Sequence, residues 1–198
     1  MYMCSQYRNR YRYNSLRYAG RDYSGPGKYF VTICTLGTKE WFGKVMNGKM
    51  HLSEIGHIAS KMWYELPDHF PFIGLDAFVV MPDHIHGIIV INRFIKTLIV
   101  GALHATPLPS PDSKFQKNET MSTISPKSGS LSVVIRSYKS AVTKDAHKFD
   151  NVFSWQHGFY DTIICTNGQL SRIRKYISNN VQNRDLSVRS LNINNQLE

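Results

Sequence analysis

The hydrophobic positions of this chain fall into short runs with strand spacing and longer runs with helical spacing. Runs rich in β-branched and aromatic residues predict the strands Lys28–Thr35, Ile73–Met81, His84–Ile91 and a short strand within Trp155–Ile164. Asn47 and Gly48 stand between two short alternating runs, which predicts a tight hairpin over Lys44–Leu52. The chain is therefore expected to contain an extensive β-sheet.

Apolar residues recur at helical spacing in three further segments. These segments are Ser53–Leu66, Leu131–Lys144 and Gln169 to about Val181. Ser53 and Ser130 are expected to cap the first two helices, and Pro67 is expected to end the first. The residues from Arg184 onward are polar and are expected to fray.

Strands and helices interleave along the chain, but the two strands around Pro82 are expected to be antiparallel neighbours. This order predicts an α+β protein with a ferredoxin-like antiparallel sheet and helices packed on one face. A single domain is expected over residues 25–183 of the 198, between an arm at 1–24 and a polar tail at 184–198. Residues 93–128 are rich in proline and polar residues, and we interpret them as a flexible insertion.

Charge indicates the class of partner. The formal net charge is +10 and the isoelectric point is about 9.6, which favours an anionic partner. The N-terminal arm interleaves tyrosines with basic residues, and its candidate DNA-binding residues are Arg8, Arg10, Arg12 and Arg17. Basic side chains that can bind phosphates, placed among aromatic rings that can stack on bases, predict binding to single-stranded nucleic acid. The alternatives are a solvated tail with its rings packed on the domain, and an anionic lipid surface.

Three features favour a cytoplasmic location. The apolar runs are strand-sized, the N-terminus is not apolar, and Cys4, Cys34 and Cys165 are scattered. We therefore expect no membrane span, no zinc ribbon and a reducing compartment.

His84 and His86 form the first candidate site. Side chains two residues apart on a strand share one face, so the two imidazoles could form half of a divalent-metal site. The alternative is a pair of half-buried histidines without a ligand, each of which needs a hydrogen-bond partner. Asp83 is interpreted as a turn residue, and Gly87 as a place where another group approaches the backbone closely.

Tyr176 and Asn180 form the second candidate site, one turn apart on one face of the last helix. Asn180 offers an amide oxygen to a hard cation, and Tyr176 offers a phenolic oxygen. The candidate phosphate-binding residues of the last two helices are Arg136, Lys139, Arg172 and Lys175. In the alternative interpretation Tyr176 only packs and Asn180 only ends the helix. Tyr138 is the second candidate nucleophile.

Three blocks of the sequence together resemble a known family. They are Val80–Gly87 (VMPDHIHG), Trp155–Asp161 (WQHGFYD) and Arg174–Asn180 (RKYISNN). In this order they look like the signatures of the single-tyrosine HUH transposases of small bacterial insertion sequences. Within these, the chain is most similar to the REP-associated tyrosine transposases. A His-hydrophobe-His motif alone is a weak signal, whereas three blocks in the family's order are specific.

The resemblance implies a ferredoxin-like domain that cleaves and rejoins DNA. By analogy, His84 and His86 would bind a divalent ion, Mg or Mn, with Asn180 at the position of the third ligand. Tyr176 would attack the DNA and form a 5′-phosphotyrosine link. The implied substrate is single-stranded DNA with a hairpin. Whether two subunits of a homodimer share a site is left open.

The chain departs from the family at two positions of the site region. Val181 stands where the family usually has proline, which allows the helix to continue and changes the tilt of Asn180. Cys165 stands where the family often has arginine. Three other functions stay open: a non-catalytic structure-specific DNA-binding protein, a relaxase or replication initiator, and a metal hydrolase that uses the histidine pair with Asp83 or His69.

Overall fold

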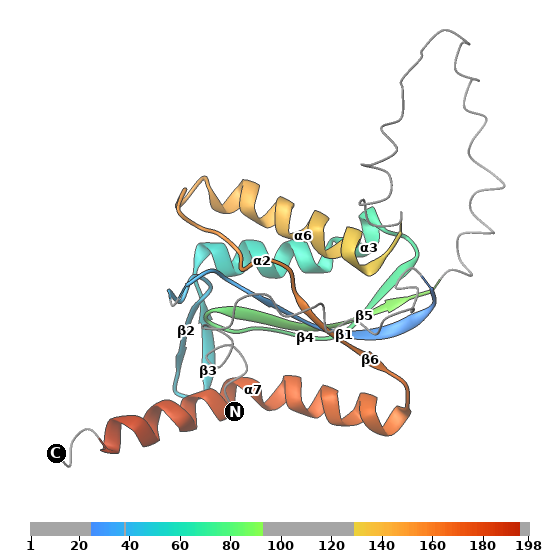
Figure 1. Ribbon diagram of the computed structural model, residues 1–198. Helices are drawn as coiled ribbons and strands as arrows, with labels where there is room; N and C mark the ends of the chain where they lie inside the picture. Colours follow the sequence, from blue (N-terminus) through green and yellow to red (C-terminus); the bar gives the residue numbers. More distant parts are fainter. Residues whose placement is uncertain (1–24, 38, 93–128, 195–198) are drawn as a thin grey trace, which may run out of the picture.

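A four-stranded antiparallel sheet forms the centre of the protein (Figure 1). The computed structural model describes residues 25–37, 39–92 and 129–194, with side chains to Arg184. The strands are β1 (Gly27–Cys34), β4 (Ile73–Val80), β5 (His84–Ile91) and β6 (Tyr160–Ile164). Their order in the sheet is β4-β5-β1-β6. Because β5 returns between β4 and β1, the topology is the split βαβ arrangement expected of a ferredoxin-like fold, and the predicted α+β class is confirmed.

The predicted hairpin is also present. Strands β2 (Gly43–Met46) and β3 (Lys49–Leu52) pair with each other beside the main sheet. Asn47 and Gly48 have φ angles of 52° and 71°, the left-handed values that a two-residue type I′ turn requires.

Helices cover both faces of the sheet (Figure 1). Helices α2 (Glu54–Tyr64) and α6 (Leu131–Ala146) lie together on one face, as predicted, and the one-turn helix α3 (Leu66–His69) follows α2. Helix α7 (Asn167–Asn194) differs from the one-face prediction because it lies on the opposite face. The apolar run of β5 explains both layers, since a strand buried on two sides needs cover on each.

The two faces of β5 have separate cores. Ile85 and Ile89 belong to the large core under α2 and α6, whereas Ile88 packs with Leu170 and Ile177 of α7. Residues of even number on β5 therefore face α7. This parity puts His84 and His86 on the α7 side of the sheet.

Trp63 is the centre of the large core. It is fully buried, as predicted, and its indole stacks on Phe78 at 4.7 Å between ring centroids. A Cβ added at Gly87 would lie 2.2 Å from the Trp63 ring. The group that approaches the backbone at Gly87 is therefore the indole of α2.

Two predicted helix ends differ in the structure. Helix α7 runs to Asn194, although fraying was predicted from Arg184, because no glycine or proline follows Gly168 to interrupt the helix. Pro67 lies in the first turn of α3, where its missing N–H is tolerated. Ser53 caps α2 as predicted, but Ser130 stands at the N-cap of α6 without making the side-chain hydrogen bond.

The predicted arm at 1–24 and the insertion at 93–128 lie outside the described residues. Arg8, Arg10, Arg12 and Arg17 therefore stay predictions. Among the described helices, none combines the length and the hydropathy that a membrane span requires.

Candidate active site

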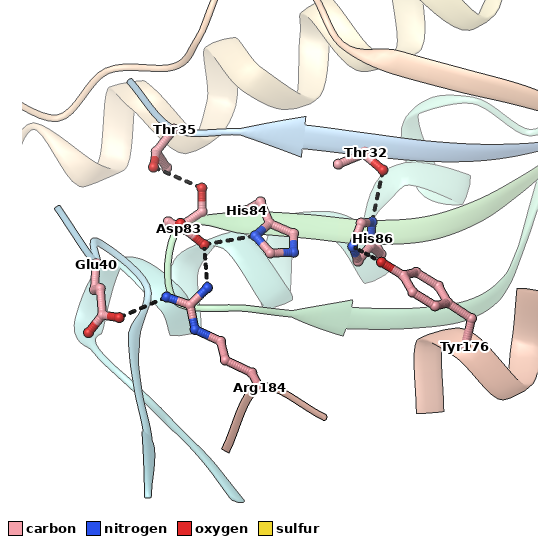
Figure 2. Close-up of polar contacts among 8 residues, drawn as sticks. All are labelled: Thr32, Thr35, Glu40, Asp83, His84, His86, Tyr176 and Arg184. Carbon is pink, nitrogen blue, oxygen red and sulfur yellow. Dashed lines mark hydrogen bonds and ion pairs between the residues drawn. The ribbon is translucent and has the colours of Figure 1, made fainter. Parts of the chain in front are cut away.

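The histidine pair lies on one face of β5, as strand periodicity predicted. The ring centroids of His84 and His86 are 4.6 Å apart, and His86 is only 1% exposed (Figure 2). Strand β5 is central in the sheet, so both rings are carried by rigid backbone. The pair is therefore preorganised by the fold.

Each imidazole is held through its Nδ1 atom. Nδ1 of His84 lies 2.8 Å from Oδ1 of Asp83, and Nδ1 of His86 lies 2.8 Å from Oγ1 of Thr32 (Figure 2). Thr32 is the direct partner of His86 in the β1–β5 register. An ionised carboxylate can only accept, so Asp83 favours the His84 tautomer with its proton on Nδ1. The Nε2 atom then keeps its lone pair for a metal ion or a proton.

Tyr176 reaches this pair from helix α7. Its hydroxyl oxygen lies 3.3 Å from Nε2 of His86, and the two rings meet edge to face at 5.3 Å between centroids (Figure 2). Phe30 of β1 stacks on His86 and meets the edge of Tyr176, so it supports both rings. Tyr176 is 37% exposed, which leaves the phenol open to a large substrate. The phenol and both imidazoles meet within a single chain.

The other candidate nucleophile is a core residue. Tyr138 is 1% exposed, and its hydroxyl donates a hydrogen bond to the carbonyl of Ala59 at 2.8 Å. Burial raises the pKa of its phenol well above the ordinary value. Tyr138 therefore has a structural role, and Tyr176 is the phenol at the site.

The electrostatics of the site keep both His86 and Asp83 deprotonated at neutral pH. Burial lowers the pKa of His86 well below its usual 6.5, and the charge of His84 lowers it further, so His86 is a neutral imidazole at neutral pH. Burial alone would raise the pKa of Asp83, but the hydrogen bond from His84 and the charges of His84 and Arg184 outweigh it, and the pKa is about 2. A neutral imidazole and a carboxylate are the forms that metal coordination requires.

Asn180 is the third candidate ligand, one turn beyond Tyr176 on α7. Its Nδ2 atom is buried and has no hydrogen-bond partner among the described residues. A buried orphan amide needs an explanation, and an amide that rotates by half a turn presents its oxygen instead. The described residues contain no cluster of three or more His, Cys, Asp or Glu suited to a metal. The imidazole pair and the amide of Asn180 are the nitrogen and oxygen donors that a divalent ion of this kind accepts.

The predicted phosphate-binding residues separate into two groups. Arg172 and Lys175 are exposed on α7, the helix of Tyr176. Arg136 and Lys139 belong to α6 on the other face of the sheet, so the structure does not bring them to the tyrosine. Lys139 instead donates to the carbonyls of Gln156 and Gly158 at 2.7 and 2.9 Å, which fixes the loop before β6.

Sequence reasoning missed how three side chains support the site. Thr32 was an ordinary strand residue and Arg184 the start of a frayed tail, while Asp83 was a turn residue and, in the hydrolase alternative, a candidate partner of the histidine pair. The structure shows Arg184 bonded to Asp83 Oδ1 at 3.1 Å and to Glu40 Oε1 at 2.9 Å (Figure 2). A signal was available for Arg184, because positions 176, 180 and 184 are spaced by four and share one face of a continuous helix.

Comparisons with known proteins give a relative in sequence and several chains with a similar fold. No family model matches the chain. An uncharacterized protein of Haemophilus influenzae is 32% identical over 169 residues, which cover 84% of this chain and 86% of that protein. The fold is similar to that of a REP-associated tyrosine transposase bound to a REP hairpin, with a TM-score of 0.49 and 16% identity over 88% of this chain and 73% of that chain. It is also similar to that of a candidate transposase of Deinococcus radiodurans R1, with a TM-score of 0.38 and 15% identity over 82% and 96% of the two chains.

Proposed function

This chain belongs to the same family as the uncharacterized Haemophilus influenzae protein, and we propose that it is a DNA transposase that cleaves and rejoins single-stranded DNA through a 5′-phosphotyrosine. The observation that supports this proposal is the 3.3 Å approach of the Tyr176 hydroxyl to Nε2 of His86. A phenol, two imidazoles and an amide are the groups that the sequence resemblance to the single-tyrosine HUH transposases requires. They come from two segments far apart in the sequence.

The proposed chemistry is transesterification. The oxygen of Tyr176 attacks a backbone phosphorus, the bond from phosphorus to the 3′ oxygen breaks, and the leaving 3′ oxygen takes up a proton. The product is a 5′-phosphotyrosine and a free 3′ hydroxyl, so one phosphodiester replaces another. Attack by the 3′ hydroxyl of a second DNA end reverses the step and joins the two ends. Neither step consumes water or a nucleotide.

The chain's own residues have defined tasks in this step. The phenol of Tyr176 has an ordinary pKa near 10, so it needs a partner for its proton. His86 stays neutral because it is buried, and its Nε2 lies in hydrogen-bond range of that phenol. In the proposed metal-bound site the same lone pair would hold the ion, and the charge of the ion would favour loss of the phenol proton instead. Thr32 and Asp83 keep the two imidazoles in orientation.

The proposed cofactor is a divalent metal, Mg or Mn, and the residues that would hold it are His84, His86 and Asn180. When bound, such an ion polarises the scissile phosphate and favours the phenolate. The orphan amide of Asn180 and the Nδ1 contacts of the histidines are what support this part of the proposal.

The proposed substrate is single-stranded DNA that carries a hairpin. The net charge of +10 and the exposed Arg172 and Lys175 on the tyrosine helix suit a phosphate backbone. The phenol and the imidazoles of one chain lie together, which supports cleavage within one subunit as part of this proposal.

The test is covalent capture. The full-length chain is incubated with labelled single strands that carry hairpins, in the presence of Mn²⁺, and adducts are separated under denaturing conditions. The expected result is an adduct with the parent chain and none with Tyr176→Phe, whereas Tyr138→Phe forms the adduct normally. If no strand gives an adduct, the proposed cleavage activity is refuted. If Tyr176→Phe labels like the parent, Tyr176 is not the nucleophile and this mechanism is wrong.

A further inference from the structure

Asp83 lies where three parts of the protein meet. Its carboxylate oxygen Oδ1 contacts Nδ1 of His84 at 2.8 Å and a guanidinium nitrogen of Arg184 at 3.1 Å (Figure 2). Its main-chain carbonyl accepts hydrogen bonds from the N–H and the hydroxyl of Thr35, both at 2.9 Å. Thr35, the residue after β1, therefore fixes the backbone of Asp83, while helix α7 fixes its side chain.

Arg184 adds a second contact that sets its orientation. One guanidinium nitrogen binds Asp83 and the other binds Glu40 at 2.9 Å, so the planar fork bridges two carboxylates. The side chain of Asp83 is 12% exposed, compared with 28% for Arg184 and 40% for Glu40. The Asp83 contact is the sheltered one, where a charge-assisted hydrogen bond is least screened.

From this geometry we propose that Asp83 and Arg184 are positioning residues for His84. Asp83 holds the His84 ring with its Nδ1 proton inward and Nε2 on the Tyr176 side, and Arg184 keeps the carboxylate in that rotamer. The helix that supplies the nucleophile thereby also orients the imidazole on which the proposed function relies. This inference rests on the proposed function for its purpose, but its geometry can be tested without DNA or catalysis.

The physical reason is that a single oxygen, Oδ1 of Asp83, binds both His84 and Arg184. A carboxylate that hydrogen-bonds the remote nitrogen of a metal-binding histidine fixes its tautomer and ring angle, and its loss typically weakens metal affinity 10- to 100-fold. Without Arg184, the side chain of Asp83 can rotate toward solvent and release His84. Loss of Arg184 should therefore act in the same direction as loss of Asp83, but less strongly.

A matched control is present on the same helix. Arg174 binds Asp76 of β4 through two hydrogen bonds of 2.8 and 2.6 Å, and it contacts neither histidine. Arg174 and Arg184 are both arginines of α7 paired with carboxylates. Arg174→Met therefore removes a helix–sheet ion pair without touching Asp83, which separates general loosening of α7 from the orientation of His84.

The experiment measures two quantities on the full-length chain without DNA. The tautomer of His84 is read from long-range ¹H–¹⁵N spectra of the metal-free protein at about pH 8, where histidine is neutral. The dissociation constant for Mn²⁺ is read by electron paramagnetic resonance. The variants are Asp83→Ala, Asp83→Asn, Arg184→Met, Arg184→Lys, Arg174→Met and His84→Ala.

The parent should show one His84 tautomer, with the proton on Nδ1. Asp83→Ala should give mixed tautomers and weaken Mn²⁺ binding by about 10- to 100-fold. Arg184→Met should shift both readouts in the same direction by several-fold, Arg184→Lys should restore part of the effect, and Arg174→Met should change neither. Asp83→Asn, which keeps an acceptor oxygen, should retain the tautomer better than Asp83→Ala.

Two results separate the possible failures. If His84→Ala abolishes Mn²⁺ binding while Asp83→Ala and Arg184→Met bind like the parent with one tautomer, the positioning role is refuted and the proposed function stands. If the parent binds no Mn²⁺ but the tautomer responds as expected, the metal part of the proposed function fails while the positioning of His84 holds. Equal effects of Arg174→Met and Arg184→Met would assign both to loosening of the helix and overturn the inference.

Discussion

The hydrogen bond between Thr32 and His86 gives the sharpest test of how the site is built. Thr32 and His86 are 4% and 1% exposed, and their contact is 2.8 Å long. Thr32→Val keeps the shape of the side chain but removes the hydroxyl. Nδ1 of His86 then has no partner in a region that water does not reach, which costs about 1–3 kcal/mol of stability.

This cost translates into a measurable change in melting temperature. For a domain of this size, each kcal/mol lowers Tm by about 2–4 °C, so Thr32→Val should lower Tm by about 2–12 °C. Thr32→Val should reduce adduct formation more than it reduces stability, because the ring of His86 can then turn away from Tyr176. Adduct formation should fall by about 10- to 100-fold, the usual range for loss of a histidine's remote hydrogen bond.

Thr32→Ser is the control for this prediction. It keeps the hydroxyl and loses one methyl group, so it reports the packing cost of the substitution alone. Thermal unfolding and covalent capture are measured for both variants. If Thr32→Val and Thr32→Ser match each other in Tm and in adduct yield, the hydroxyl does not hold His86 and the account of the site is wrong.

Three further predictions follow from the same contacts. Gly87→Ala should destabilise the fold by about 1–3 kcal/mol or more, because its Cβ would overlap the Trp63 ring. The control is Gly74→Ala, whose Cβ would lie 3.9 Å from its nearest atom and should be close to neutral. Both stabilities are measured by chemical denaturation. Tyr138→Phe should lose about 1 kcal/mol in the same assay and keep full adduct formation, because its hydroxyl bonds only within the core. The unfolding free energy should decrease as the pH falls below 6.5, because the pKa of His86 is lowered in the fold and only the unfolded chain takes up the proton. The variant His86→Gln should flatten this dependence on pH. An unchanged slope would show that His86 is not buried in the neutral form.

Asp83 is a second reason why the free energy of unfolding should decrease at acid pH. Its pKa of about 2 lies below the ordinary value of 3.8, so the ionised group contributes about 2 kcal/mol that is present above pH 3.8 and lost as the pH falls toward 2. This window lies well below the one for His86. The two groups can therefore be distinguished by the pH at which stability declines.

Local sequence pattern predicted the parts of the site that depend on one element. The shared face of His84 and His86 follows from a strand period of two, and the stacking of Tyr176 with Asn180 follows from helical spacing. The hairpin turn at Asn47 followed from the same kind of local rule. These inferences need no knowledge of how elements pack.

The contacts between elements could not be derived in that way. Thr32 meets His86 only because β1 and β5 pair in one register, which the composition of β1 does not encode. The meeting of Tyr176 with the histidines was expected only from the resemblance to a family. Helix α7 was predicted too short because polar composition was taken as fraying, whereas the absence of glycine and proline was the better guide.

Helix α7 unites these separate contacts. Tyr176, Asn180 and Arg184 are spaced by four residues, so one stripe of the helix carries the proposed nucleophile, the candidate ligand and the arginine that binds Asp83. The opposite partners, His86 and Asp83, lie on or just before β5, with Thr32 and Thr35 of the β1 segment behind them. Any displacement of α7 along the sheet therefore changes the position of the Tyr176 hydroxyl and the orientation of the His84 ring together. It follows that weakening the packing of Ile177 should impair both at once, even though Ile177 contacts no substrate, while the sheet and its histidine pair remain folded.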